Sequence, residues 1–534
     1  MNCTSARLPY RQTNCFTTMM LDYLDHAESV RPFYQHTPSL QGIQKAIAER
    51  QKFSTNRKVL VEELKKQYGS VEQNDAVKKS IESLLSENTF TITTAHQPNI
   101  FTGPLYFIYK ILHAIKLSEH CKASLPQYNF VPVFYIGSED ADLDELGHFF
   151  LNGEKIAWNT KQTGAVGRMK IDKELLKLIM QLDGQLSVLP YGKEILSVIK
   201  DCYKEGVLVQ DATFKLINTL FGEYGLIVLI PDNAALKKQA AKIFEDDLLN
   251  ETASEVVDQT ADRLQAAGYK LQANPREINL FYLNDGMRER IVRIKDKFVT
   301  HDSRLTFDET EIPSELSEHP ERFSPNVILR GIYQEIILPN LVYIGGGGEI
   351  AYWLQLKDLF EFYKIPYPVL LLRNSFLVVE KKWQEKISKL GFATEDFFLP
   401  EQELMNRLVA RETKNDIKLN GNFTDADKLY ESLKKQAVAV DATLGKHVEA
   451  LRTQSIYRLR ELEKKMLRAE KRKFTDQQRQ IHTIKENLFP KNGLQERIDN
   501  FMYYYAKWGK GFIRCLHKQS LALEEEFVIL SEVT

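Results

Sequence analysis

The sequence predicts an α/β protein with a parallel-sheet core and inserted connecting segments, followed by a long α-helical coiled coil. Short apolar runs near Phe90, Phe130, Tyr224, Leu341 and Pro366 each end in a polar or glycine-rich turn, as buried parallel strands do. Toward the end of the chain, apolar residues recur at steps of three and four, and no Gly or Pro lies between residues 446 and 489. That second pattern is typical of a coiled coil.

Length and charge set the broad class of protein. A chain of 534 residues suggests roughly two to four structural units. Its 71 basic and 72 acidic groups nearly cancel, so no overall charge attracts it to nucleic acid or an anionic membrane. The N-terminus lacks the apolar core of a signal peptide, and no stretch approaches the roughly 18 to 20 apolar residues of a membrane span. We expect a cytoplasmic protein without nucleic-acid or membrane partners.

The cysteines show neither a disulfide framework nor a structural zinc site. They are scattered without a CxxC pair, at Cys3, Cys15, Cys121, Cys202 and Cys515. Free thiols are therefore expected. Cys121 could be a nucleophile, but no partner base is indicated, and an ordinary thiol is the favoured interpretation.

The pattern divides the chain into four parts. Helical spacing comes first, strand-like runs follow, and a mixed stretch and a hairpin signal around Asn284-Asp285-Gly286 interrupt the strands. The expected parts are 1–88, helical and packing on the core; 89–398, the core with insertions near 151–210 and 276–327; 399–489, the coiled coil; and 490–534, returning to the core.

The stretch from Phe90 to Tyr109 reads as a strand, a polar turn and the start of a helix. In open α/β sheets, ligands bind at the carboxyl ends of strands, where N–H groups of the next helix can hold an anion. The residues expected there are His96, Gln97, Asn99, Thr102, Gly103 and Tyr106, with Thr102 as a helix cap. An ordinary strand-to-helix connection is the alternative.

An acidic cluster follows the second expected strand. Ser138, Glu139, Asp140 and Asp142 come directly after Gly137. Such a cluster could bind Mg²⁺, hold an ammonium group or supply a general base. Alternatively, Ser138 caps a helix whose first turn favours acidic side chains. The place of the cluster beside the first motif favours a functional site.

Four consecutive glycines, Gly345, Gly346, Gly347 and Gly348, follow a short strand and precede Glu349 at a helix start. Backbone N–H groups can approach a phosphate or carboxylate closely there. The spacing is neither GxGxxG nor a P-loop, and a flexible turn is the alternative. Arg373 ends a further strand and suits a two-pronged anion contact, although pairing with a structural carboxylate explains it equally well.

The apolar seam of the coil includes Leu444, Val448, Leu462 and Met466. A helix from about Asp425 to Lys473 would extend roughly 70 Å. A second helix, 475–488, is expected to fold back on it or to meet a partner. The basic segment 458–473 could contact nucleic acid, but a solvated coil face is favoured because the whole chain is neutral.

Several pieces together resemble the cysteine-adding enzymes of bacillithiol biosynthesis, the BshC family. They are HQPNIFTGPLY, VPVFYIGSEDAD, LPNLVYIGGGGEIAYWLQL, LRNS, ELEKKMLRAEKRK and LFPKNGLQER, which occur in order along nearly the whole chain. The resemblance implies a Rossmann-like core with two connecting insertions, an antiparallel coiled coil and a homodimer formed through that coil. It also implies a carbon–nitrogen ligase that joins L-cysteine to glucosaminyl-malate in the last step of the pathway.

Amide formation needs an activated carboxyl group and an amine that has lost a proton. His96, Glu139, Asp140 and Asp142 are the expected catalytic groups, with His96 as the base because imidazole titrates near neutral pH. The expected substrate-binding groups are Gln97, Asn99, Thr102, Gly103, Tyr106, Ser138, Gly345, Gly346, Gly347, Gly348, Glu349 and Arg373. ATP and Mg²⁺ are possible from this chemistry, but no motif shows either, so the cofactor stays open.

Two other classes of function compete with the ligase. A non-catalytic coiled-coil scaffold could bind a nucleotide or sugar as a regulator, and it would make no sugar-thiol product. A nucleic-acid-binding protein would show salt-dependent retention on DNA. Thiol profiling of a deletion strain separates the ligase from both.

Overall fold

The computed structural model describes residues 2–533 and divides into two compact units. The larger unit contains the residues up to Val378 together with those from Gly493 onward. The smaller unit is Val379–Asn492. The last part of the chain thus belongs to the larger unit.

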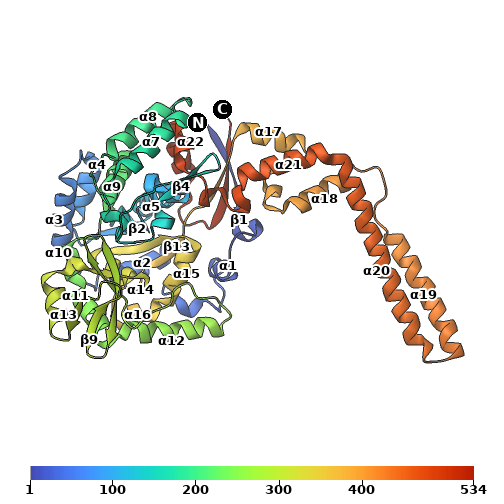
Figure 1. The fold of residues 1–534 in the computed structure, drawn as a ribbon, viewed down its shortest axis with the longest axis horizontal. Coiled ribbons are helices and arrows are strands. Elements are labelled where there is room, and N and C mark those ends of the chain that lie inside the picture. Colours follow the sequence, from blue (N-terminus) through green and yellow to red (C-terminus); the bar gives the residue numbers. More distant parts are fainter. Residues whose placement is uncertain (1, 534) are drawn as a thin grey trace. The chain divides into compact units, whose positions relative to one another are not determined.

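The core of the larger unit is a five-stranded sheet in the order β13-β12-β2-β3-β6. All neighbouring strands pair in parallel, as predicted (Figure 1). The strands are β2 (Thr89–His96), β3 (Asn129–Ile136), β6 (Ile227–Leu229), β12 (Asn340–Gly345) and β13 (Val369–Leu372). They are buried along almost their whole length, which explains why they read as continuous apolar runs.

Helix α5 (Tyr106–Ser124) follows β2 and is the central helix of the unit. The sequence predicts one apolar face, but the helix is buried on nearly all sides, and even Lys110 and His113 are inaccessible. One side packs on β2 and β3, and another meets the C-terminal segment, where His113 Nε2 lies 2.9 Å from the carbonyl oxygen of Ala522. Thr102 is not its cap, because the capping position is Leu105.

The first and last segments of the chain pair with each other. Helices α1 (Thr18–Leu24), α2 (Leu40–Arg50), α3 (Arg57–Tyr68) and α4 (Asp75–Ser83) confirm the helical N-terminal prediction. The sequence did not predict β1 (Cys3–Pro9), which pairs antiparallel with β15 (Glu526–Glu532) in a sheet completed by β14 (Phe376–Val379). Helices α22 (Phe501–Trp508) and α23 (Lys510–Gln519) precede β15, so the C-terminal aromatic residues return to the core as predicted.

Cys3 and Cys515 form a disulfide, so the expectation of free thiols is wrong for these two residues. They lie 512 positions apart in sequence, yet β1 and α23 bring their Cα atoms to 6.5 Å, within the range that a disulfide spans. Sequence spacing could not reveal that proximity. Cys15, Cys121 and Cys202 remain thiols, as expected.

Two insertions interrupt the parallel sheet. The first contains the hairpin β4 (His148–Leu151) and β5 (Glu154–Ala157), then α7 (Lys173–Leu186), α8 (Gly192–Cys202) and α9 (Val209–Phe221). The second is an antiparallel sheet of β7 (Leu280–Asn284), β8 (Met287–Ile294), β9 (Lys297–Thr300), β10 (Thr306–Asp308) and β11 (Phe323–Pro325). Asn284 pairs with Met287, which confirms the predicted hairpin turn at Asp285-Gly286.

Further helices surround the sheet of the larger unit. They are α10 (Ala234–Lys237), α11 (Ala241–Asn250), α12 (Thr252–Ala266), α13 (Glu311–Glu318), α14 (Val327–Ile337), α15 (Gly347–Gln355) and α16 (Lys357–Phe362). Of these, α14 and α15 begin beside the carboxyl ends of core strands and position the site described below.

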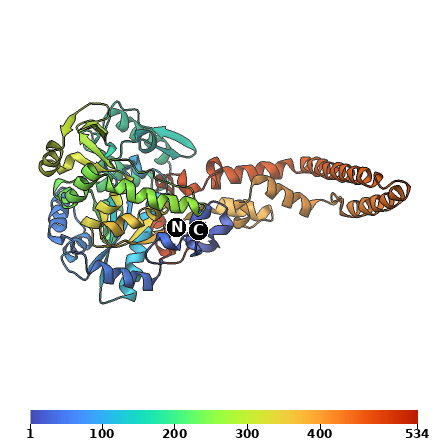
Figure 2. The ribbon, with the colours of Figure 1, turned by 90° about the horizontal axis from the view of Figure 1, so that it is seen from below.

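The smaller unit is an antiparallel helical hairpin with shorter helices at its base (Figure 1 and Figure 2). The single helix expected from Asp425 to Lys473 is wrong, because the chain turns at Asp441 to Thr443 between α19 (Asn420–Val440) and α20 (Leu444–Lys471). Side-chain bonds from Tyr430 to Ser455 and from Asp427 to Arg452 join the two helices. The remaining helices are α17 (Lys381–Lys389), α18 (Glu401–Glu412) and α21 (Thr475–Leu488).

No helix among residues 2–533 has the length and apolar character needed to cross a membrane.

Candidate functional site

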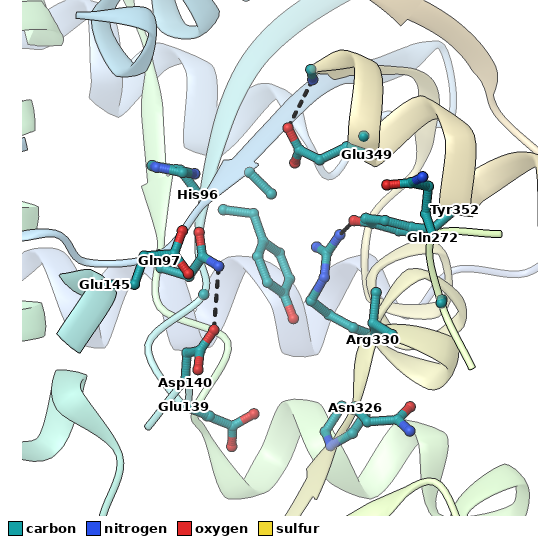
Figure 3. Close-up of a pocket in the computed structure, with 18 of the residues that line it drawn as sticks. His96, Gln97, Glu139, Asp140, Glu145, Gln272, Asn326, Arg330, Glu349 and Tyr352 are labelled. Atoms are coloured by element: carbon teal, nitrogen blue, oxygen red, sulfur yellow. Dashed lines mark hydrogen bonds between the residues drawn. The ribbon is translucent and has the colours of Figure 1, made fainter. Parts of the chain in front are cut away.

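A cavity of about 870 Å³ lies at the carboxyl ends of β2, β3 and β12, beside the first turns of α14 and α15. Ligands of open parallel sheets bind at this edge. Figure 3 shows Gln97, Glu139, Asp140 and Glu145 on one side of the cavity and Arg330, Tyr352, Gln272 and Asn326 on the other. The predicted residues that line the cavity are His96, Gln97, Tyr106, Ser138, Glu139, Asp140, Gly346, Gly347, Gly348, Glu349 and Arg373.

Glu139 is a buried carboxylate on the wall of the cavity and forms an ion pair with Lys237, which is also buried. Burial raises the pKa of Glu139, and the ammonium group of Lys237 opposes that rise. Lys237 also donates to Asp232 Oδ1 at 3.2 Å and to the carbonyl oxygen of Glu321 at 3.1 Å. The lysine therefore holds the Glu139 side chain from behind the cavity wall.

Asp140 lies next to Glu139 and is only half-buried. Its Oδ2 accepts a hydrogen bond from Gln97 Nε2 at 3.2 Å, which joins the ends of β2 and β3 (Figure 3). Its Oδ1 accepts from the backbone N–H of Asp142 at 3.2 Å. Asp142 itself caps the short helix α6 (Leu143–Leu146) through the N–H of Glu145 and does not line the cavity.

His96 ends β2 and faces the cavity, but its environment differs from the one expected for a general base (Figure 3). Burial, aided by the positive charge of Lys110, lowers the pKa of His96 to about 3. The ring lies against Tyr106 and Phe107, with centroids 5.2 and 5.4 Å away. The premise that His96 titrates near neutral pH is therefore wrong, and the imidazole stays neutral.

Glu349 stabilises the glycine turn through hydrogen bonds of its carboxylate. Glu349 Oε2 accepts from the N–H of Gly346 at 2.8 Å and pairs with the buried Lys110, while Oε1 accepts from the Tyr343 hydroxyl at 2.7 Å. Burial alone would raise the pKa of Glu349, but Lys110 and the other partners lower it to about 2. Both carboxylate oxygens thus have partners within the protein, and Glu349 stabilises the turn while lining the cavity.

Only part of the glycine turn can meet a ligand. Gly345 lies in β12 and does not line the cavity, and the N–H of Gly346 is bonded to Glu349. Gly347 and Gly348 line the cavity in the first turn of α15, where a helix leaves its N–H groups without intrahelical partners. None of the four glycines has a positive φ, so the turn does not depend on left-handed backbone.

Arg373 lies at the end of β13, as predicted, but its guanidinium is paired within the protein. Nη2 donates to the buried carboxylate of Glu496 at 2.7 Å, and Nη1 donates to Ser375 Oγ at 3.1 Å. The guanidinium also lies 4.9 Å from the Tyr106 ring centroid. Of the two interpretations left open by the sequence, structural pairing with a carboxylate is the one observed.

Asn99, Thr102 and Gly103 do not line the cavity. Their turn is buried, and the N–H groups of Thr102 and Gly103 donate to the carbonyl oxygens of Asn99 and Ile100, both at 3.1 Å. Asn500 Nδ2 donates to the carbonyl oxygen of Gly103 at 2.7 Å. The expectation of an anion site on this turn is therefore wrong, because its N–H groups already have partners.

Three buried polar atoms on the cavity wall have no hydrogen-bond partner in the described chain. They are His96 Nε2, Ser138 Oγ and Arg330 Nη1, from the end of β2, the end of β3 and the first turn of α14. Ser138 is not the helix cap considered from the sequence, because Asp142 caps α6. Buried polar groups are nearly always bonded, so three unsatisfied atoms on one cavity indicate a place for a polar ligand.

Comparison with known proteins identifies the family. A family model described as Bacillithiol biosynthesis BshC, N-terminal Rossmann-like domain, matches residues 1–374, and one for the C-terminal coiled-coil domain matches residues 376–532. The chain belongs to the BshC family. Relatives named "Putative cysteine ligase BshC" include those of Flavobacterium johnsoniae, 38% identical over 98% of this chain and 99% of the relative, and of Salinibacter ruber, 30% identical over 95% of each.

The cavity of this BshC family member also contains residues that the sequence analysis missed. Arg330 lines the cavity, and as the one basic residue in the apolar run VILRGIYQEII it gave a usable signal. Lys110 and Lys237 lie behind the wall and pair with Glu349 and Glu139. The other missed lining residues carried no clear signal. They include Tyr135, Gln272, Asn274, Arg276, Arg288, Arg290, Asn326, Tyr352 and Arg497.

The described residues of this BshC chain contain no cluster of three or more His, Cys, Asp or Glu side chains suited to hold a metal ion. Of the acidic groups considered for Mg²⁺, Glu139 is paired with Lys237 and Asp142 caps a helix. The acidic wall is better suited to an ammonium group, for which carboxylates are the natural partners.

Proposed function

We propose that the chain is a ligase that forms an amide bond between the carboxyl group of L-cysteine and the amine of glucosaminyl-malate. The family supports this proposal, since its relatives are named as cysteine ligases and its models refer to bacillithiol biosynthesis. Glucosaminyl-malate carries one amine and two carboxylates, and a site for it needs groups of both charges.

The observation that carries the proposal is a cavity that holds acidic side chains on one side and a basic side chain on the other. Glu139 and Asp140 lie on one side, and Arg330 lies on the other (Figure 3). The three unsatisfied atoms of His96, Ser138 and Arg330 add donors and acceptors that water or a polar substrate must satisfy.

The acidic wall would bind the acceptor amine and take its proton. Burial raises the pKa of Glu139, which makes that carboxylate a better proton acceptor than an exposed one. Lys237 holds it in place from behind. His96, with a pKa of about 3, is too weak a base for this step and would instead bond to the substrate through Nε2. The base is therefore assigned to Glu139 in place of His96.

The cysteine carboxylate needs activation, because carboxylate and amine otherwise form a salt. In the activated form, the amine nitrogen attacks the carboxyl carbon, the activating group leaves with one oxygen, and the amine proton passes to Glu139. ATP is the ordinary activating cosubstrate, and its Mg²⁺ would be held largely by the nucleotide phosphates. The N–H groups of Gly347 and Gly348 suit an anionic group in this process.

We also propose that the chain forms a homodimer through its helical hairpin. No residue of α19 is buried, and apolar side chains on both hairpin helices remain exposed, namely Leu429, Leu433, Val438, Val440, Leu444, Leu451, Tyr457 and Leu462. A second copy of the same hairpin offers a matching apolar surface.

Low-molecular-weight thiol profiling of a deletion strain tests the ligase proposal. We expect the final thiol to disappear and glucosaminyl-malate to accumulate. Complementation with the wild-type chain should restore the thiol, whereas Glu139→Gln should restore roughly 1% of it or less. Unchanged thiol in the deletion strain would refute the proposal.

A further inference from the structure

Arg330 is half-buried on the cavity wall and has no carboxylate partner, unlike the fully buried Arg373 and Arg50. Arg373 pairs with Glu496, and Arg50 pairs with Glu335. Arg330 makes no ion pair with any residue from 2 to 533. Its Nη2 donates to the hydroxyls of Tyr352 and Tyr343, the latter at 3.3 Å, and its buried Nη1 has no partner.

A charged guanidinium enclosed by neutral groups is costly unless something compensates it. Arg330 lies over the rings of Tyr135 and Tyr343, with its carbon 5.7 and 5.8 Å from their centroids. Ring faces compensate part of the charge. The unsatisfied Nη1 faces a cavity with room for a ligand, and Arg presents its N–H groups in the geometry that a carboxylate accepts.

The tyrosines around Arg330 are oriented by a chain of bonds. The Tyr343 hydroxyl donates its proton to Glu349, so its oxygen can only accept from Arg330. Glu349 adds a stabilising negative charge nearby, but its carboxylate bonds Lys110 and makes no ion pair with Arg330. Nη2 is therefore held by neutral oxygens, and the positive charge stays available to a ligand.

We propose that Arg330 binds a carboxylate of the malyl group and thereby determines that the cavity accepts acid-bearing glucosamine derivatives over neutral ones. This inference rests on the proposed function, because it assumes glucosaminyl-malate as the acceptor. The amine would then face Glu139 and Asp140 across the cavity. Tyr343 is a positioning residue that acts through Arg330.

Equilibrium binding of two probes tests the assignment. The probes are glucosaminyl-malate and methyl glucosaminide, which has the same amine but no carboxylate. We expect the wild type to bind the acidic probe at least about 10-fold more tightly, since a charged hydrogen-bonded contact typically contributes that much. Arg330→Gln should abolish the preference for the acidic probe. Arg330→Lys should retain part of it, because lysine keeps the positive charge but cannot make the two parallel hydrogen bonds of a guanidinium.

A matched control is Arg290→Gln, which removes an exposed arginine from the same cavity. It should keep the preference for the acidic probe. Arg330→Gln that retains the wild-type preference, or a wild type without any preference, would overturn the assignment. Loss of the preference in Arg290→Gln as well would also overturn it, because general charge rather than Arg330 would then be responsible.

Tyr343→Phe gives a second test that does not depend on the stability of an arginine variant. It removes the hydroxyl that accepts from Arg330 and donates to Glu349, so KM for the acceptor should rise about 3- to 10-fold with little change in kcat. Tyr367→Phe is the control, because its buried hydroxyl bonds the carbonyl oxygen of Trp353 at 2.7 Å outside the cavity. Equal KM values in both variants would contradict the positioning role.

The two proposals fail separately. If the probe preference depends on Arg330 but no cysteine adduct forms, the ligase function is wrong and the carboxylate site stands. If the adduct forms and Arg330→Gln keeps the preference, the function stands and the assignment of Arg330 is wrong.

Discussion

At the residue scale, burial and neighbouring charges give some side chains a different role from the one that their residue type suggests. His96 is a histidine at the end of a core strand, which sequence reasoning takes as a base near neutral pH. Burial and the charge of Lys110 instead lower its pKa to about 3, so it is neutral wherever the protein is folded at ordinary pH. Burial and a nearby lysine, both products of tertiary structure, decide this outcome.

The lowered pKa of His96 predicts a pH-dependent stability. In the unfolded chain its pKa is near 6.5, so between about pH 6.5 and 3 the unfolded state binds a proton that the folded state does not. The free energy of unfolding should therefore decrease as the pH falls through that window. His96 should contribute about 1.4 kcal/mol of this decrease per pH unit. Denaturant unfolding measures the free energy of unfolding at pH 7 and at pH 5. The decrease between the two pH values should be about 2 kcal/mol smaller in His96→Gln than in the wild type.

The exposed His447→Gln serves as the control for this measurement, and its loss of stability should match that of the wild type. An identical pH slope in His96→Gln and wild type would show that His96 is not held neutral by the fold. His113, whose pKa burial lowers to about 4, is present in all three proteins and does not affect the comparison.

The sequence grouped several candidate residues that the structure brings to one cavity, but it could not assign their partners. His96, Gln97, Glu139, Asp140 and Arg373 all line the cavity. The Arg373 partner, Glu496, is 123 residues away in sequence, and no local pattern links the two. For the same reason, the N–H groups beside Thr102 looked available until the fold provided their acceptors.

At the element scale, the core strands and the hairpin turn at Asp285-Gly286 were predictable because their signals are local. The edge strand β1 was not, because its pairing with β15 depends on the opposite end of the chain. The break between α19 and α20 was also missed, since it contains neither Gly nor Pro. There Asp441 Oδ1 accepts from the N–H and hydroxyl of Thr443, both at 2.7 Å, and forms a local turn.

The glycine turn allows a paired test of structure against binding. A Cβ at Gly345 would lie 3.0 Å from both Glu349 and Tyr343, so Gly345→Ala should lower stability by about 1 to 3 kcal/mol through overpacking. A Cβ at Gly348 would meet only Gln272, at 3.9 Å, and would face the cavity. Gly348→Ala should leave the melting temperature near normal and weaken acceptor binding, as measured by thermal shift and by titration.

A melting temperature that falls equally in both glycine variants would contradict this division of roles. So would a Gly348→Ala protein that binds acceptor as the wild type does.

At the scale of the whole molecule, exposed apolar residues on the hairpin predict association. Leu451→Glu with Leu462→Glu places charges on surfaces where a second hairpin would bury them, at a cost of several kcal/mol. Light scattering should show a dimer for wild type and a monomer for the double variant. Lys464→Glu, at an exposed polar position, should remain dimeric. A dimer that survives both leucine changes would place the interface elsewhere.

The disulfide between Cys3 and Cys515 predicts a further property of the whole chain. It joins segments 512 residues apart, so it should restrict the unfolded state and contribute about 2 to 4 kcal/mol. Cys3→Ser should lower the melting temperature, while Cys15→Ser should not. Peptide mapping without reductant should recover the Cys3 and Cys515 peptides as one linked species. Separate thiol peptides under oxidising conditions would show that the bond does not form.

The central claim is that this chain joins cysteine to glucosaminyl-malate, and isotope transfer tests it most directly. Extract from the deletion strain, supplied with glucosaminyl-malate and isotope-labelled cysteine, should form the labelled amide only after purified protein is added. Glu139→Gln should form at least about 100-fold less in the same extract. Labelled amide made without the protein, or none made with the folded wild type, would contradict the claim.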